Sequence, residues 1–167
     1  MKNKIQKIST MLWFDTQAEE AARFYTSVFK NSKLGRITHY GKVGLEINGK
    51  LDGTVKTVEF QLEGQDFVAL NGGPQFKFTE VISFIVNCQS QEELDYYWGK
   101  LSEGGDEKAQ VCGWLKDKYG ISWQIIPDNL TEMLSDSNSE RSERVMNVIM
   151  QVKGKIDIEA LMQAYEG

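Results

Sequence analysis

Residues 9–25 read STMLWFDTQAEEAARFY, and they decide the fold because the same arrangement returns later in the chain. The extended apolar run STMLWFD (9–15) precedes EEAARFY (19–25), just as VISFIVN (81–87) precedes EELDYYW (92–98), at an offset of 73 residues. The second segment of each pair, EEAARFY in the first and EELDYYW in the second, has apolar residues at helical spacing. Polar residues precede each helix pattern, as N-caps do: Asp15–Thr16 and Gln89–Ser90. This self-similarity predicts two copies of one strand–helix unit.

Further strands are predicted after each helix, separated by turns that contain glycine. In the first half they lie at about 33–40, 54–62 and 66–71. In the second half they lie at about 110–116 and 121–126, with a short one near 107. One half alone could not cover the apolar surface of its sheet. The predicted class is therefore α+β, with one continuous twisted sheet curled into a cup and the helices outside.

The end of the chain departs from this repeat. Residues 128–167 contain three helix patterns in succession, which predict a C-terminal helical extension. The expected organisation is one domain over 1–127, with half-modules at about 5–75 and 76–127, followed by the extension at 128–167.

Composition excludes several classes of protein. The chain has 167 residues, and its net charge of -5 argues against a nucleic-acid-binding surface. The apolar run MLWF (11–14) is too short for a signal segment or a membrane span, so we expect a cytoplasmic protein without a membrane partner.

Cys88 and Cys112 form no CxxC pair and are expected to be reduced thiols. A single histidine, His39, excludes a two-histidine metal site or a Cys/His zinc site within one chain.

Three strings spread over residues 8–127 resemble the PhnB-like family, which is often labelled demethylubiquinone methyltransferase-like. They are MLWFDTQAEEAARFYTSVFKNS, FVALNGGPQFKFTEVISFIVNC and CGWLKDKYGISWQIIP. The family belongs to the vicinal-oxygen-chelate (glyoxalase and bleomycin-resistance) superfamily. The resemblance implies paired βαβββ modules forming a cup-shaped sheet. Because proteins of this fold commonly pair, it also implies a homodimer, which the apolar helical tail supports.

The resemblance also indicates where a metal would bind. In the metalloenzymes of the superfamily, ligands come from inward-facing positions on the first and last strands of each half. Here those positions fall on Ser9 (or on Thr10 if the register slips by one residue), on Ile82 as the repeat equivalent of Ser9, on one of Phe67, Ala69 and Asn71, and on Gln124. This set lacks anionic and imidazole donors, so no metal is predicted. The glycine doublets at 72–73 and 104–105 do not open a helix after a strand, so no S-adenosylmethionine site or other cofactor is predicted.

Alternation along the last strand assigns the two tryptophans of residues 112–127. If Gln124 points into the cup, Trp123 points towards the helices and is core. Leu115 joins that core, which leaves Trp114 facing the cup. The result is a candidate small-molecule pocket with aromatic walls and a few polar groups. The candidate residues are Ser9, Met11, Trp13, Asn71, Cys112, Trp114, Lys116 and Gln124. The alternative is that these side chains collapse together and leave no cavity.

Three functions stay open at this point. The favoured one is a metal-free protein that binds an unidentified small molecule. The second is an enzyme, either lyase- or isomerase-like or the methyltransferase of the family label, with a non-metal site where Lys116 lowers the pKa of the Cys112 thiol. The third is a dimeric assembly module whose tail helices contact a partner. No triad or acid pair emerges, so no catalytic residue is assigned.

Overall fold

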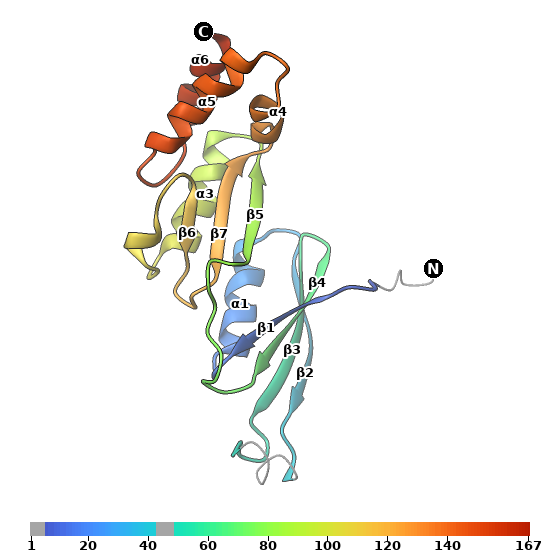
Figure 1. Cartoon of the computed structure of the whole chain (residues 1–167). Coiled ribbons are helices and arrows are strands. Elements are labelled where there is room, and N and C mark those ends of the chain that lie inside the picture. Colours follow the sequence, from blue (N-terminus) through green and yellow to red (C-terminus); the bar gives the residue numbers. More distant parts are fainter. Residues whose placement is uncertain (1–5, 43–48) are drawn as a thin grey trace, which may run out of the picture. The chain divides into compact units, whose positions relative to one another are not determined.

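The computed structural model describes residues 6–42 and 49–167, and the chain divides into two compact units, Met1–Lys77 and Phe78–Gly167. The described elements of the first unit are β1 (Thr10–Phe14), α1 (Ala18–Val28), β2 (Lys33–His39), β3 (Val55–Leu62) and β4 (Gln65–Asn71). Those of the second unit are β5 (Ser83–Cys88), α3 (Gln91–Ser102), the 3-10 turn η1 (Glu107–Ala109), β6 (Trp114–Lys116), β7 (Ser122–Pro127), α4 (Leu130–Leu134), α5 (Ser139–Gln151) and α6 (Ile158–Glu166). Figure 1 labels the strands and the α-helices.

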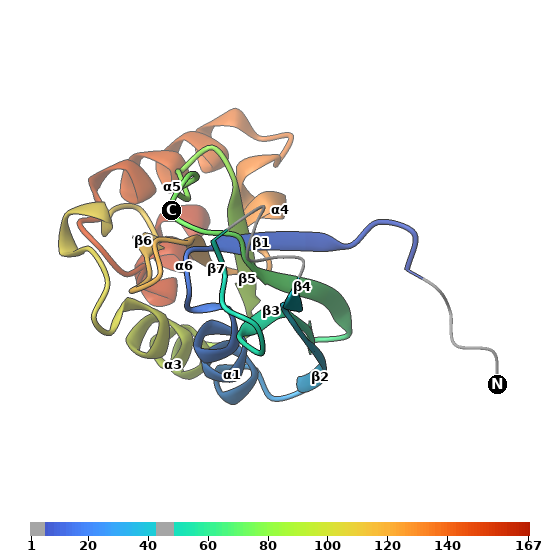
Figure 2. The same cartoon turned by 90° about the horizontal axis from the view of Figure 1, so that it is seen from below.

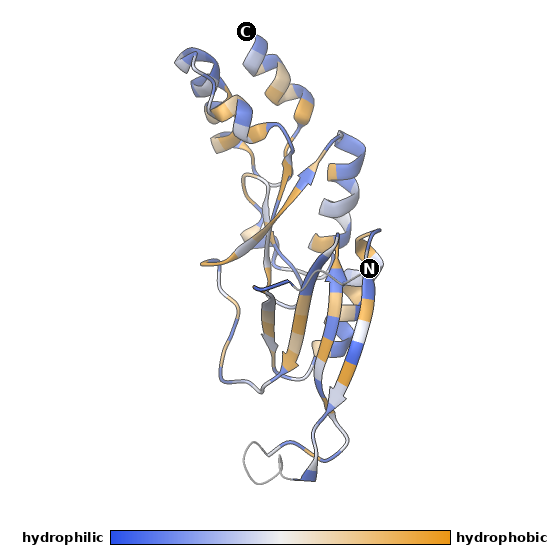
Figure 3. Ribbon diagram, turned by 90° about the vertical axis from the view of Figure 1, so that its right-hand side faces the viewer, coloured by the Kyte–Doolittle hydropathy of each residue, from blue (hydrophilic) through white to orange (hydrophobic). Residues whose placement is uncertain are grey.

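The first unit is a four-stranded sheet with one helix against it. The strand order is β1-β4-β3-β2, with β1 parallel to β4 and the other neighbours antiparallel. Apolar and polar residues alternate along β3 (VKTVEFQL), whereas β1 and β4 contain continuous apolar runs, and Figure 3 shows the hydropathy of the strands; one face of the sheet points towards α1. Leu12 and Phe14 on that face are buried, and the ring of Tyr25 from α1 stacks on Phe60 at 6.4 Å between centroids. This layer is the core of the unit.

The second unit repeats the plan with a smaller sheet. Its strand order is β5-β7-β6, with β5 parallel to β7 and β6 antiparallel to it. The N-cap of α3 is Ser90, whose hydroxyl accepts a hydrogen bond from the Glu93 amide, so the predicted N-cap is confirmed. The face of the sheet that packs against α3 carries the core. Trp123 is 4% exposed, and Leu115 and Ile125 beside it are fully buried, which confirms Trp123 as core.

The chain after α3 differs from the prediction between residues 107 and 113. A 3-10 turn replaces the short strand expected near 107. The strand expected at 110–116 is interrupted by a two-residue turn, in which Cys112 has φ +52° and Gly113 has φ +81°. Positive φ at both central residues defines a type I′ turn, and the Trp114 amide closes it by donating to the Val111 carbonyl at 2.8 Å. Only Trp114–Lys116 therefore continues as strand β6.

Three helices follow β7, as the sequence predicts. α5 and α6 lie side by side, as Figures 1 and 2 show. Val145 and Ile149 of α5 are buried. The Arg144 guanidinium donates to the last carbonyls of α6, at 2.6 Å to Ala164 and 3.0 Å to Tyr165. These bonds satisfy carbonyl groups that the end of a helix otherwise leaves unpaired.

The α+β class and the paired strand–helix–strand modules are thus confirmed. Hydrogen bonding joins the described strands into two sheets, one in each unit, where the sequence suggested one continuous sheet. Within residues 6–42 and 49–167, no helix has both the length and the apolar character needed to cross a membrane.

Candidate functional site

The face of the second sheet that points away from α3 carries three of the predicted site residues. Two rows of side chains cross the three strands on this face. In one row Ile85 of β5, Gln124 of β7 and Trp114 of β6 are neighbours. In the next row Ser83, Ser122 and Lys116 are neighbours. We call these two rows, formed by Ser83, Ile85, Trp114, Lys116, Ser122 and Gln124, the polar face.

Three predicted site residues are therefore brought together: Trp114, Lys116 and Gln124. The Gln124 side-chain amide donates to the Ser83 hydroxyl at 2.8 Å. Lys116 forms an ion pair with Glu80, a residue of the turn before β5. The hydrogen bond and charge of Lys116 hold the pKa of the Glu80 carboxyl below its ordinary value, the hydrogen bond being the larger cause.

Ser83 was not among the predicted site residues, because the offset that relates the two copies of the repeat differs between their strands and their helices. In the structure Leu12 and Phe14 face α1 while Val86 and Cys88 face α3, so the strands correspond at an offset of 74. The helices correspond at 73, because the second strand-to-helix link is one residue shorter. The repeat equivalent of Ser9 is therefore Ser83 and not Ile82.

Cys112 does not join the strand that carries the polar face. It lies in the type I′ turn, and its amide donates to the Val152 carbonyl at 3.0 Å, while the Gly113 amide donates to Gly154 at 2.9 Å. The turn is thus docked on the α5–α6 connection. The ion pair that the structure shows for Lys116 is with Glu80 and not with the Cys112 thiol. The second thiol, Cys88, is buried, and this burial raises its pKa to about 12.

Asp117, at the turn between β6 and β7, is a buried residue that was not among the predicted site residues. It is 3% exposed. One carboxylate oxygen accepts from the amides of Tyr119 (2.9 Å) and Ile121 (3.0 Å), and the other accepts from the indole N–H of Trp123 (2.8 Å). The motif Asp-x-x-Gly in KDKYG is typical of a turn organised by an aspartate and could have indicated the first two bonds.

In the first unit, Met11 and Trp13 lie on the face of β1 opposite Leu12 and Phe14. Met11 is 57% exposed. The Trp13 indole lies over Gly72, where an added Cβ would come within 2.2 Å of the ring, and its N–H donates to the Gly73 carbonyl at 2.9 Å. Phe76 packs edge-on against the same ring. The Gly72–Gly73 doublet therefore seats the Trp13 indole in this structure.

Asn71 lies on the other face of the sheet, so its predicted orientation towards the cup is corrected. It pairs with Phe14 across β1 and β4 and is buried on the side of α1. Its side-chain oxygen accepts from the Ala18 amide at 2.8 Å, which caps α1 in place of the predicted Asp15–Thr16. Its amide group donates to the Val55 carbonyl at 3.0 Å.

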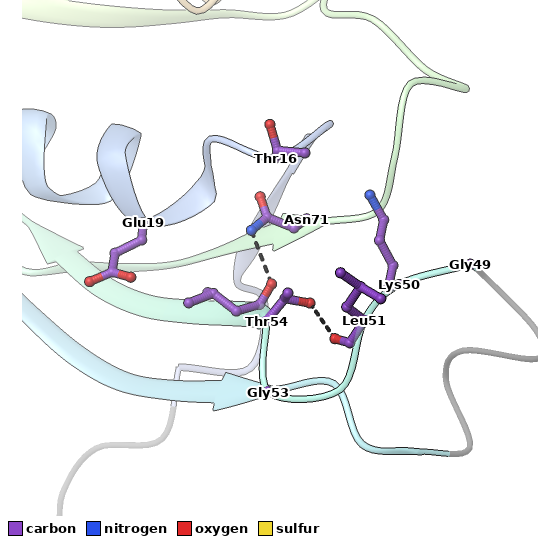
Figure 4. Close-up of a pocket in the computed structure, with 9 residues that line it drawn as sticks. Thr16, Glu19, Gly49, Lys50, Leu51, Gly53, Thr54 and Asn71 are labelled. Carbon is purple, nitrogen blue, oxygen red and sulfur yellow. Dashed lines mark hydrogen bonds between the residues drawn. The ribbon is translucent and has the colours of Figure 1, made fainter.

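A pocket of about 570 Å³ opens beside Asn71 and was not predicted from the sequence. Figure 4 shows Thr16 and Glu19 at the start of α1, with Lys50, Leu51 and Thr54 opposite them. Lys50 lies 3.8 Å from the Asp15 carboxylate and donates to the Asp15 carbonyl at 3.3 Å. The described lining thus contains charges of both signs, and two of its polar side chains, Thr54 and Asn71, already donate to the lining carbonyls of Leu51 and Val55.

Ser9 lines a groove of about 350 Å³ in the first unit. Charged side chains also line this groove, namely Lys33, Glu59 and Asp66.

The repeat equivalent of Gln124 in the first unit is Val68, on the face of β4 that points away from α1. Val68 pairs with Met11 as Gln124 pairs with Ile85.

The corrected metal-ligand set is therefore Ser9, Ser83, Val68 and Gln124, which still lacks anionic and imidazole donors. Over residues 6–42 and 49–167, no three His, Cys, Asp or Glu side chains are grouped so that they could hold a metal ion. The residues present do not fit the metal centre known in the superfamily's metalloenzymes.

A strand–helix–strand module repeated in one chain, each copy with a helix on one face of its sheet, defines an α+β protein of the glyoxalase type. A family model described as 3-demethylubiquinone-9 3-methyltransferase matches residues 6–126. The PhnB protein from Bacillus cereus, provisionally named a 3-demethylubiquinone-9 3-methyltransferase, is 36% identical, with a TM-score of 0.61 over 73% of this chain and 98% of that one. The chain therefore belongs to this PhnB-like family.

A protein from Pseudomonas aeruginosa is 17% identical, with a TM-score of 0.57 over 74% of this chain and 97% of that one, and shows the same fold. None of the curated proteins matches this chain. The relatives' fold thus supports the architecture described above, while the activity in the family description comes from the name alone.

Proposed function

We propose that the chain is a metal-free protein of the vicinal-oxygen-chelate superfamily that binds a small molecule on the polar face. The supporting observation is that Trp114, Lys116 and Gln124 come together on one face of the second sheet, away from the α3 core. An aromatic surface beside a few polar groups is typical of small-molecule sites. The enzyme alternatives have less support, because Cys112 is separate from this face and the glycine doublet at 72–73 is filled by Trp13.

Native mass spectrometry of the purified protein tests this proposal. We expect a co-purified small molecule and no stoichiometric zinc, nickel or iron, because the four candidate positions lack anionic and imidazole donors. Trp114→Ala should release the ligand. Trp98→Ala is the matched control, since Trp98 is also half-buried but lies on α3. One metal ion per chain after dialysis without chelator would contradict the metal-free proposal.

The same proposal includes a homodimer. β5 is an edge strand of its sheet, and the residues at its start are apolar and exposed: Val81 (89%), Ile82 (72%) and Ile85 (54%). An apolar edge is a surface that proteins usually cover. We expect light scattering at micromolar concentration to give twice the chain mass of 19.0 kDa.

A lysine beside the edge strand β5 should shift the equilibrium between monomer and dimer. Ile82→Lys is expected to favour the monomer, whereas Val111→Lys, a control at another exposed apolar residue (48%), should leave the dimer intact. A wild-type mass equal to one chain would count against the homodimer.

A further inference from the structure

The ion pair between Lys116 and Glu80 lies at one end of the polar face. The Lys116 side chain is 22% exposed, whereas that of Glu80 is 63% exposed and belongs to a turn outside the sheet. An exposed carboxylate gains little from an ion pair, because water solvates it almost as well. Glu80 can therefore leave Lys116 at low cost, provided that another anion takes its place.

Beside Lys116 lies the Ser122 hydroxyl, which Glu80 leaves without a hydrogen bond. Ser122 is 2% exposed, and its Oγ finds no hydrogen-bond partner in the described part of the chain. Such a buried, unpaired hydroxyl is uncommon in folded proteins. Ser122 is the cross-strand partner of Lys116 on the same face, which places their Cβ atoms roughly 5 Å apart. An anionic oxygen at this point could accept from both groups, whereas Glu80 satisfies only the lysine.

We propose that the polar face binds the anionic group of its ligand, a carboxylate or a phosphate, in exchange for the Glu80 carboxylate at Lys116. This inference rests on the proposed small-molecule function and names the class of ligand. The adjacent row supplies the rest of the site, because Trp114 and Ile85 lie two residues along their strands, about 7 Å away. The ligand is therefore an anion with an apolar or aromatic body of about one ring.

A titration of the ¹⁵N-labelled full chain tests the inference at constant ionic strength. Benzoate and phenyl phosphate are the anionic probes, and benzamide is the neutral match for benzoate. The backbone amide signals of Ser122 and Gln124 report binding. We expect saturable shifts with an anionic probe and a clearly weaker response with benzamide.

Four variants separate the parts of the site. Glu80→Gln removes the competing carboxylate and should tighten anion binding roughly two- to fivefold. Lys116→Gln should weaken it at least about tenfold, because a charge-assisted hydrogen bond is lost. Ser122→Ala should weaken it roughly two- to tenfold while the thermal stability stays equal or rises, since an unsatisfied hydroxyl disappears. Asp95→Asn is the control: it breaks the ion pair between Asp95 and Lys155 (2.6 Å) in the same unit and should leave the affinity for the anionic probe unchanged.

The outcomes separate this inference from the function it rests on. Unchanged anion affinity in Glu80→Gln or in Lys116→Gln would overturn the exchange at Lys116. Benzamide binding as tightly as benzoate would overturn the anionic class and leave small-molecule binding in place. No saturable shift with any of the three probes also defeats the inference, and the proposed function falls with it only if native mass spectrometry finds no co-purified molecule.

Discussion

Trp123→Ala is expected to destabilise the protein by about 3–5 kcal/mol, because it removes a large side chain from a closely packed core. Trp123 is 4% exposed, and the centroid of its ring lies 5.3 Å from that of Phe84. Its indole N–H donates to the carboxylate of buried Asp117. Ligand binding should weaken only where the protein unfolds. Urea unfolding followed by circular dichroism measures the free energy of unfolding without relying on the tryptophan that is removed.

Trp114→Ala is the matched comparison, since Trp114 lies nine residues earlier and is only half-buried. Its truncation should cost about 1–2 kcal/mol, within the usual range for single substitutions. The same change should weaken the binding of a co-purified or screened ligand, because the aromatic surface on the polar face is lost. A larger loss of stability in Trp114→Ala than in Trp123→Ala would contradict the assignment of the two side chains to opposite faces.

Strand alternation was the most reliable part of the sequence interpretation. It requires only the period of two and one fixed point, so Gln124, Trp123 and Trp114 were assigned to the faces that the structure shows. The strands and helices of the first half were also predicted to within a few residues. Their signals are local: apolar runs, helical spacing and glycine-containing turns.

The errors arose where the backbone departs from a regular period. Cys112 adopts φ +52° although cysteine has no preference for this conformation, so nothing in the residue type indicated a type I′ turn. Asn71 was placed on the wrong face because its parity was carried from the family's ligand positions and not from the register with β1. A link shorter by one residue moved Ser83 out of the repeat alignment. These features depend on contacts between distant segments, such as Asn71 with Ala18.

The hydrogen bond from Trp123 to Asp117 could not be assigned from the sequence either, and removal of the Asp117 carboxylate gives the second large expected effect. Asp117→Ala should destabilise the protein by about 3–5 kcal/mol. The reason is that three N–H groups lose their acceptor at once, and each donor that stays buried costs about 1–3 kcal/mol, less where water reaches the turn. Chemical unfolding of the variant against wild type measures the loss.

Asp117→Asn divides this effect between the two carboxylate oxygens. The asparagine carbonyl can still accept from the amides of Tyr119 and Ile121, but its NH₂ group then faces the indole N–H of Trp123, donor against donor. We expect about 1–3 kcal/mol of destabilisation from that single conflict. In a Trp123→Phe background the indole donor is absent, so the asparagine should cost clearly less than it does in the wild type.

The double-mutant cycle of these two substitutions measures the coupling directly. A coupling energy near zero would mean that Asp117 does not hold Trp123, and the large effect of Trp123→Ala would then come from lost packing alone. A positive coupling would mean that one buried carboxylate fixes both the β6–β7 turn and the core tryptophan. Because Lys116 and Ser122 flank that turn on opposite strands, the same carboxylate would then also keep the polar face in register.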